Sequence, residues 1–188
     1  MSSRRFTLFT LLVLIAFFLS QVLAANDRNY QKIKPSSSPF ASALEALQKQ
    51  INYNFQNVGL LRRAMTHPSF SEENNRALSV MGSNVIDTFV SLFSLRKDID
   101  ISSKELNRRI AEISKVETSC AVDGMRLGLD KVVRVSYKTN STAPAVVCGA
   151  FRALFGAIAI DTGKSDDAGS VFWGVHSHNT ISGKATAF

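Results

Sequence analysis

Residues that cross-link small proteins are scarce in this chain of 188 residues. Only two cysteines occur, Cys120 and Cys148, which excludes a disulfide-dense mini-protein and a zinc site built from four cysteines. A disordered chain is also excluded, because 45% of the residues are hydrophobic and 20% are charged. The sequence has no internal repeats, and its length suits one domain with a hydrophobic core rather than two.

Acidic residues are absent from residues 1–24, and this segment has the layout of a secretory signal peptide. Two arginines precede an apolar run over residues 6–19, and Val22 and Ala24 fit the small-residue positions of a cleavage site. We therefore predict cleavage before Ala25, which leaves no stable membrane span. One alternative is an uncleaved anchor, for which the run is shorter than the roughly 20 residues required. The other is an organelle transit peptide, which should be amphipathic rather than uniformly apolar.

The net charge of +7, from 22 basic and 15 acidic residues, is typical of a protein that binds nucleic acid or an acidic membrane. Cleavage after residue 24 removes two arginines and no acidic residue. The mature chain of 164 residues then carries +5, from 20 basic and 15 acidic side chains. A charge of this size is ordinary, so it does not by itself indicate a nucleic-acid ligand.

Polar segments flank the central part of the chain. Residues 25–42 include the run Pro35–Pro39 and are interpreted as a flexible linker. Residues 176–188 show no apolar periodicity, and residues 174–188 are interpreted as a flexible C-terminal tail. His176 and His178 have the spacing of a metal-binding pair, but no Cys, Asp or Glu lies near enough in sequence to complete a site. A solvated tail is therefore the favoured interpretation.

Residues 43–173 are predicted to form one all-α domain. Apolar residues recur there at helical spacing, and turn-forming residues such as Pro68 and Gly163 separate the segments. Ser103 is a candidate N-cap. Residues 131–137 alternate between apolar and polar side chains, but the run is short, and we predict an extended connection. The main predicted helices lie around Leu44–Ile51, Leu60–Met65, Leu78–Phe93, Leu106–Ile113 and Val146–Ile160.

Five short strings, taken in order, resemble the catalytic domain of ribonuclease III. The match spans about residues 43–173. It implies the all-α ribonuclease III endonuclease-like fold, in a family whose members usually form homodimers and cut double-stranded RNA with a divalent metal. The strings and their family counterparts are Ala64–Phe70 with ALTHPSY, Asn75–Ile86 with NERLEFLGDAVL, Glu105–Thr118 with ELTKLRAALVSNET, Leu127–Leu129 with LGL, and Ala150–Ile158 with AFEALIGAI.

The four metal ligands of that family do not carry over to this chain. The family has a Glu and an Asp four residues apart on one helix, and an Asp and a Glu three residues apart on a later helix. These spacings place each pair on one helix face. The corresponding residues here are Ser79, Ser83, Gly149 and Arg152. Magnesium prefers carboxylate oxygens, and Arg152 adds a cation that repels it. We therefore predict no metal, no cofactor and no ribonuclease activity.

A rebuilt metal site is one alternative. Asp87 follows Ser83 by one helical turn, and it could act together with Glu72 or Glu73.

RNA binding without cleavage is another alternative. Ser79, Ser83 and Arg152 could form a small polar pocket for a phosphate. Ordinary solvated charges are the favoured interpretation of the basic residues nearby, so we do not expect double-stranded RNA to be the ligand. The residues that could add positive surface are Arg108, Arg109, Lys115, Arg134 and Lys138.

Entry into the secretory pathway would give a meaning to two further sets of residues. Asn140-Ser141-Thr142 is a sequon for N-linked glycosylation in a polar loop. Cys120 and Cys148 lie on two helices that we expect to pack together, and an oxidising lumen would permit a disulfide. The alternative is that both cysteines are small buried apolar residues. A Cα–Cα distance above about 7 Å would exclude the bond.

Three functions follow from these observations. The favoured one is a non-catalytic interaction protein of the secretory pathway, resident in the endoplasmic reticulum lumen or secreted, that acts through protein partners or as a homodimer. The chain has a predicted signal peptide followed by one domain that lacks the family's metal ligands. In this arrangement it resembles a plant protein required for fusion of the polar nuclei in the female gametophyte. This resemblance implies the same role here. The alternatives are an RNA-processing endonuclease of a plastid, a mitochondrion or the nucleus, and an RNA-binding module.

Overall fold

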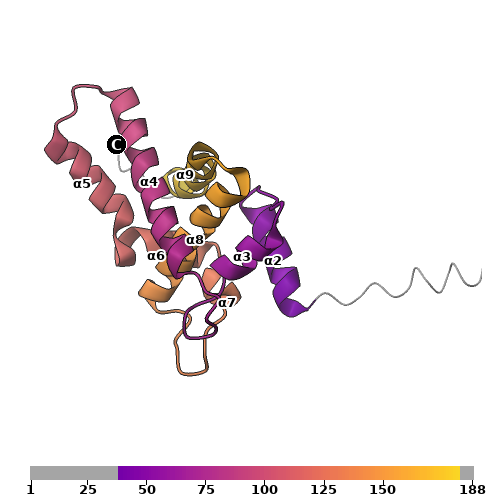
Figure 1. The fold of residues 1–188 in the computed structure, drawn as a ribbon. Helices are drawn as coiled ribbons and strands as arrows, with labels where there is room; N and C mark the ends of the chain where they lie inside the picture. Colours follow the sequence, from indigo (N-terminus) through magenta and orange to yellow (C-terminus); the bar gives the residue numbers. More distant parts are fainter. Residues whose placement is uncertain (1–37, 183–188) are drawn as a thin grey trace, which may run out of the picture. The chain divides into compact units, whose positions relative to one another are not determined.

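The computed structural model describes residues 38–182, with side chains described through residue 177. The predicted signal peptide and most of the predicted linker lie outside the described residues, as do residues 183–188. The all-α prediction is confirmed, since the described residues form helices and one isolated bridge between Thr66 and Arg134 (Figure 1). The elements in chain order are α2 (Pro39–Gln50), α3 (Val58–Ala64), α4 (Arg76–Lys97), α5 (Ser103–Ser114), the π-helical turn η1 (Val116–Cys120), α6 (Ala121–Arg126), α7 (Leu129–Val132), α8 (Pro144–Thr162) and α9 (Ser165–Ser182).

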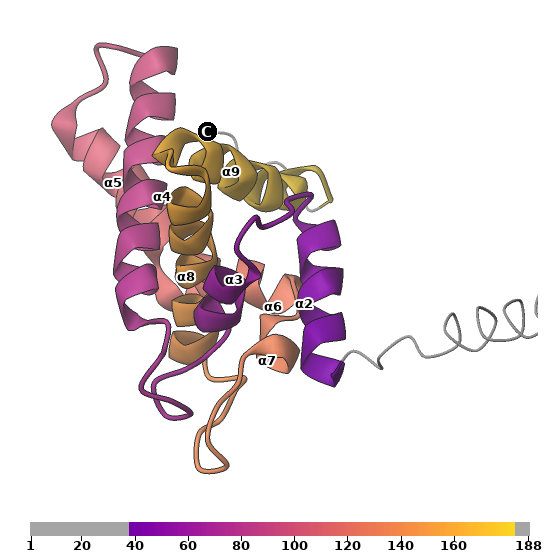
Figure 2. The same ribbon diagram turned by 45° about the vertical axis from the view of Figure 1, so that its right-hand side comes forward.

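Helix α8 is the central helix of the domain. Twelve of its nineteen residues are buried, because α3, α4, α6 and α9 all pack against it (Figure 2). Its aromatic residues continue into α9: the rings of Phe151, Phe155 and Phe172 meet edge to face, with centroids 4.9 to 6.3 Å apart. The uniformly apolar stretch seen in the sequence is thus a core helix covered on several sides.

Helices α4 and α8 touch through their backbones at two glycines. A Cβ atom added to Gly82 would lie 2.9 Å from the Gly156 nitrogen, and a Cβ added to Gly156 would lie 2.9 Å from the Gly82 nitrogen. Such distances leave no room for a side chain on either residue. This crossing sets the position of residues 79–83 against the middle of α8.

Local capping residues determine where several helices begin and end. The Asn57 side chain accepts a hydrogen bond from the Gly59 N–H at the start of α3 (3.0 Å). The Ser102 hydroxyl accepts one from the Glu105 N–H at the start of α5 (3.2 Å). The prediction that Ser103 is the N-cap was wrong by one residue, because Ser103 already belongs to the helix. At the other end of the chain, Gly163 follows α8 in the left-handed conformation (φ 71°).

Helix α9 corrects the predicted C-terminal boundary. The flexible tail predicted for residues 174–188 would begin in the middle of this helix. Ala168, Phe172 and Val175 are buried at the spacing i, i+4, i+7, and α9 packs against α8 and α4. The apolar face is interrupted by small and polar residues, so only its burial against α8 makes it recognisable.

Two other boundaries also shift. Helix α2 begins at Pro39, inside the linker predicted for residues 25–42. Helix α7 takes up the first residues of the extended connection predicted for residues 131–137, and only the remainder forms a loop. Both differences lie within the few residues by which helix ends commonly vary.

Helices α4 and α8 are each long and apolar enough to cross a membrane by length and composition. In α8, 67% of the most apolar window is buried inside the domain, against 33% in α4. The hydrophobicity of α8 is therefore explained by its central position in the core.

Asp161, near the end of α8, ties that helix to the loop before α3. One carboxylate oxygen accepts hydrogen bonds from the Tyr53 hydroxyl (2.7 Å) and the Gln56 N–H (2.8 Å), and the other accepts one from the Asn57 N–H (2.8 Å). Burial alone would raise the pKa of Asp161, but the three hydrogen bonds outweigh burial and lower it. Burial, together with the same carboxylate, raises the pKa of Tyr53.

Replacing this carboxylate, Asp161→Asn, is expected to lower the free energy of unfolding by about 2 kcal/mol at pH 7, because an NH2 group would face N–H donors. The pKa of Asp161 is lower in the folded chain than in the unfolded chain. The stabilisation is therefore present above about pH 4 and disappears as the pH falls through the folded-state pKa. Urea unfolding of both proteins at several pH values measures the difference.

The control is Tyr53→Phe, which removes one of the three hydrogen bonds and should cost about 1 kcal/mol. Equal stability of Asp161→Asn and the wild type at pH 7 would contradict the role assigned to this carboxylate.

Candidate functional site

The four positions at which the resemblance places metal ligands lie on two helices that pack together. Ser79 and Ser83 are on α4, while Gly149 and Arg152 are on α8. A Cβ added to Gly82, next to Ser83, would clash with the Arg152 carbonyl oxygen, so the two pairs lie along the same helix crossing. The fold thus retains the scaffold that would place the pairs near each other.

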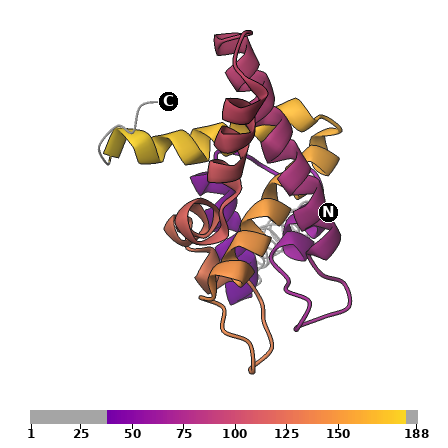
Figure 3. The same ribbon diagram turned by 90° about the vertical axis from the view of Figure 1, so that its left-hand side faces the viewer.

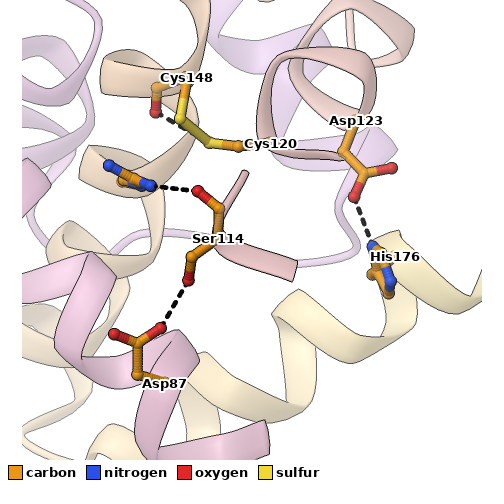
Figure 4. The surroundings of a disulfide bond; sticks show 7 residues. Asp87, Ser114, Cys120, Asp123, Cys148 and His176 are labelled. Carbon is orange, nitrogen blue, oxygen red and sulfur yellow. Dashed lines mark hydrogen bonds and ion pairs between the residues drawn. A yellow bond between two sulfur atoms is a disulfide. The ribbon is translucent and has the colours of Figure 1, made fainter. Parts of the chain in front are cut away.

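Arg152 is tied to a neighbouring helix. Its guanidinium donates a hydrogen bond to the carbonyl oxygen of Ser114 (2.7 Å), the last residue of α5. The Ser114 hydroxyl in turn donates to a carboxylate oxygen of Asp87 on α4 (2.7 Å), as Figure 4 shows. A cation at a helix C-terminus satisfies carbonyl groups that lack partners within the helix. The three residues therefore form a polar bridge that joins α8, α5 and α4.

The residues at the four positions do not fit a divalent metal. Two hydroxyl groups, a glycine without a side chain and a guanidinium offer no carboxylate oxygen, which Mg²⁺ requires in most protein sites. Arg152 brings a positive charge to a place where the family has a negative one. No chemical step through a metal follows from this arrangement.

The rebuilt metal site proposed from Asp87 with Glu72 or Glu73 finds no support. Asp87 already accepts the hydrogen bond from Ser114. Within the described part of the chain, no three His, Cys, Asp or Glu side chains come together as a group that could hold a metal ion.

Two of the basic residues considered for RNA binding are paired on the surface of α5. Arg108 forms ion pairs with Glu105 (2.7 Å) and Glu112 (2.5 Å), and Arg109 pairs with Glu105 (3.1 Å). Hydrogen bonds from Arg108 and Arg109 lower the pKa of Glu105 to about 2. These arginines are therefore already neutralised by neighbouring carboxylates.

Arg134 has a structural role. Its guanidinium lies over the rings of Phe40 (4.3 Å to the centroid) and Phe70 (4.8 Å), and it donates to the Thr66 hydroxyl oxygen (2.6 Å). Burial, with the nearby charge of Arg62, lowers the pKa of Arg134. The residue joins the start of α2 to the turn after α3.

The remaining basic candidates, Lys115 and Lys138, are exposed. Residues 39–182 as a whole carry 16 basic and 14 acidic side chains, a net charge of +2. A net charge this small gives the domain as a whole little electrostatic attraction for the phosphate backbone of a nucleic acid.

The two cysteines are joined. A disulfide links Cys120, at the end of η1, to Cys148 on α8, with the Cα atoms 5.1 Å apart (Figure 4). This distance lies within the range that a disulfide can span. Cys148 directly precedes Gly149, so the bond fastens the segment after α5 to α8 beside a family ligand position.

A buried carboxylate with two side-chain partners escaped the sequence-based interpretation. The Nδ1 atom of His176 lies 2.6 Å from a carboxylate oxygen of Asp123, whose side chain is only 2% exposed, and Arg126 contacts the other oxygen at 3.1 Å. The His176 ring also stacks on Phe172. The solvated tail expected here is therefore wrong for His176. Phe172 and Val175 are buried on the same helix, and only this packing, which the sequence does not show, reveals the position of His176.

A cavity of about 530 Å³ lies between the end of α2, α6 and α9, away from the four positions. Its charged lining residue, Arg126, is engaged with Asp123 and with the Val175 carbonyl. The cavity therefore offers no additional catalytic group.

The last predicted site residue, Asn140, lies in the exposed loop between α7 and α8. Ser136 in the same loop donates its N–H to the Ser69 hydroxyl oxygen (3.0 Å), so the loop lies against the turn after α3.

Comparison with known proteins gives a consistent picture. A family profile described as Ribonuclease-III-like matches residues 57–172. The chain is 55% identical over 181 residues to Protein NUCLEAR FUSION DEFECTIVE 2 of Arabidopsis thaliana, with 94% of each chain covered. It is 30% identical over 126 residues to Ribonuclease 3 of Albidiferax ferrireducens, where the match covers 65% of this chain and 55% of the relative.

Solved structures show the same fold. The nuclease domain of ribonuclease III from Campylobacter jejuni superimposes with a TM-score of 0.69 at 24% identity, covering 73% of this chain and 99% of that domain. A second structure of that domain gives a TM-score of 0.66 at 25% identity. The first is described as showing flexibility in a region involved in dimer formation.

Proposed function

Because this chain belongs to the ribonuclease III-like family, we propose that it is a non-catalytic member that uses the family fold to bind other proteins. One observation carries the proposal. The residue at the fourth family ligand position, Arg152, is a cation hydrogen-bonded to the end of α5, and the other three positions hold no carboxylate. A domain that holds no metal lacks the group that activates water and offsets phosphate charge in this chemistry.

The proposed biological role is in nuclear fusion. The support is the 55% identity, over nearly the whole length of both chains, to Protein NUCLEAR FUSION DEFECTIVE 2. We propose that this chain acts in the fusion of polar nuclei during female gametophyte development in plants. Fusion of nuclear envelopes suits a protein of the endoplasmic reticulum lumen, because that lumen is continuous with the nuclear envelope.

The proposed compartment is the secretory pathway. The acid-free apolar segment at residues 6–19 supports entry into it. The disulfide between Cys120 and Cys148 also supports it, because disulfides persist mainly in oxidising compartments. A plastid or mitochondrion is the alternative destination.

The proposed assembly is a homodimer. The similar nuclease domain from Campylobacter jejuni is described as having a region involved in dimer formation, which supports this proposal.

RNA binding without cleavage is the weaker candidate. Arg108 and Arg109 are paired with acidic residues, Arg134 lies between two aromatic rings, and the net charge of residues 39–182 is only +2. We therefore propose that the surface of the domain binds proteins rather than double-stranded RNA.

The experiment that tests the non-catalytic proposal is cleavage of duplex RNA by the purified chain in Mg²⁺ or Mn²⁺, beside a bacterial Ribonuclease 3. We expect cleavage at least about a thousandfold slower than by the bacterial enzyme, because the metal's several kcal/mol of transition-state stabilisation is missing. Metal-dependent cleavage that stops on addition of EDTA would overturn the proposal in favour of the endonuclease.

A matched variant tests the physical reason. The combination S79E, S83D, G149D and R152E restores the family's four carboxylates, and a Cβ at position 149 meets no atom within 4 Å. We expect this variant to bind Mn²⁺ in calorimetry while the wild type does not. Equal Mn²⁺ binding by both proteins would show that the missing carboxylates are not what prevents metal binding.

A further inference from the structure

The sequence contains a single Asn-X-Ser/Thr triplet, Asn140-Ser141-Thr142, in all of its 188 residues. It lies in the loop between α7 and α8, which projects from one end of the domain beside the turn after α3 (Figure 3). Asn140 is exposed, and so is Tyr137 three residues before it, with 92% of its surface accessible. A bulky transferase can therefore reach this loop without unfolding the core.

The triplet has a defined hydrogen-bonding arrangement. The side-chain oxygen of Asn140 accepts hydrogen bonds from the Thr142 N–H (2.9 Å) and from the Thr142 hydroxyl (2.8 Å). An amide nitrogen is a poor nucleophile because its lone pair is delocalised into the carbonyl group. Two donors on that oxygen stabilise the negative charge that develops there as the nitrogen loses a proton.

The nitrogen of the same amide is available. No residue in the described part of the chain accepts a hydrogen bond from Asn140 Nδ2, while the oxygen is held from one side by Thr142. Two backbone hydrogen bonds hold the loop on either side of Asn140. The Thr139 N–H donates to the main-chain carbonyl oxygen of Ser136 (3.0 Å), and the Ala143 N–H donates to the main-chain carbonyl oxygen of Asn140 (3.2 Å). The acceptor amide therefore stands on an anchored turn with its nitrogen free.

We propose that Asn140 is a modification site that takes one N-linked oligosaccharide from a polyprenyl-diphosphate carrier. Nδ2 forms a bond to C1 of the first sugar, the bond between C1 and the diphosphate oxygen breaks, and the amide proton passes to a base of the transferase. This inference rests on the proposed function in one respect, since the acceptor meets such a donor only in the secretory lumen.

The position of the glycan has a structural consequence. Ser136 of this loop is hydrogen-bonded to Ser69, so the loop lies beside the turn that carries Phe70, a ring with 49% of its surface exposed. A glycan on Asn140 shields Phe70 and Tyr137, the exposed aromatic rings at this end of the domain.

The test is expression of the full chain with a C-terminal tag in plant cells, followed by peptide-N-glycosidase treatment and gel electrophoresis. We expect one shift in size for the wild type and complete loss of that shift for Asn140→Gln and Thr142→Ala. Ser141→Ala and Thr142→Ser keep the acceptor and the hydroxyl, so they are matched controls that should retain the shift.

A second arm separates this inference from the proposed compartment. In it, residues 1–24 are replaced by the cleaved signal peptide of a known secreted protein, and protease protection in microsomes confirms entry into the lumen. A glycan with both leaders supports both proposals. A glycan with the replacement leader alone supports Asn140 as the acceptor and overturns the secretory location. A protected chain without a glycan overturns the modification site.

Discussion

Replacing Gly156 by alanine is expected to destabilise the domain by about 3 kcal/mol and to lower Tm by roughly 10 °C. The added Cβ would lie 2.9 Å from the Gly82 nitrogen and closer still to the Leu78 carbonyl oxygen. Both of these are backbone atoms, which cannot move aside as the end of a flexible side chain can. Helices α4 and α8 would therefore have to separate along their whole contact.

The matched control is Gly149→Ala on the same helix. A Cβ at that position meets no atom within 4 Å, so the change should be neutral or stabilise α8 by about 0.5–1 kcal/mol through the higher helix propensity of alanine. Thermal unfolding followed by circular dichroism measures both variants. If Gly156→Ala and Gly149→Ala have the same Tm, the glycine contact does not hold the two helices together.

The outcome bears on function because the same crossing positions the four family ligand sites. Gly82 stands next to Ser83, and the Arg152 carbonyl is one of the atoms that a Cβ on Gly82 would strike. The chain thus combines a close helix crossing with four positions that hold no carboxylate. This combination is compatible with the proposed use of the fold for binding.

Removing the disulfide with the double variant C120A/C148A is expected to lower the free energy of unfolding by about 3.5 kcal/mol. The bond spans 28 residues in sequence, and closing a loop of this size restricts the unfolded chain by about that amount. Both sulfur-bearing residues are buried, at 2% and 1% exposure, so the alanines also leave small cavities. Guanidinium unfolding of the oxidised wild type and the variant gives the difference.

Reduction supplies the control for this second prediction. Dithiothreitol should lower the stability of the wild type towards that of C120A/C148A and should leave the variant unchanged. A wild type whose stability is the same with and without reductant would contradict a stabilising bond. The expected result also links stability to location, because a reducing compartment would deprive the chain of this contribution.

Much of the fold could be predicted from local patterns. The apolar spacing over residues 44–51, 78–93 and 146–160 indicated α2, α4 and α8, because an amphipathic or buried helix shows its period in the sequence itself. Helix α9 was missed because its buried residues alternate with small and polar ones. Its apolar face is recognisable only once α8 is in place.

The candidate site also has some properties that the sequence shows and others that only the structure shows. The loss of the carboxylates at positions 79, 83, 149 and 152 is a property of residue types, and so it was readable without a structure. The hydrogen-bond partners of the residues at these positions could not be identified without a structure. Arg152 bonds to Ser114, 38 residues away, and Arg134 bonds to Thr66, 68 residues away.

The sequence by itself determined the helical class, the family resemblance and the lone sequon, and through that resemblance it predicted four ligand positions without a carboxylate, because each depends on residue identity and short-range spacing. Only the tertiary structure decided which charges are engaged, that His176 is buried beside Asp123, and that the glycines of α4 and α8 meet. Those properties depend on contacts between segments far apart in the chain. Such contacts arise only when packing around α8 brings the helices together.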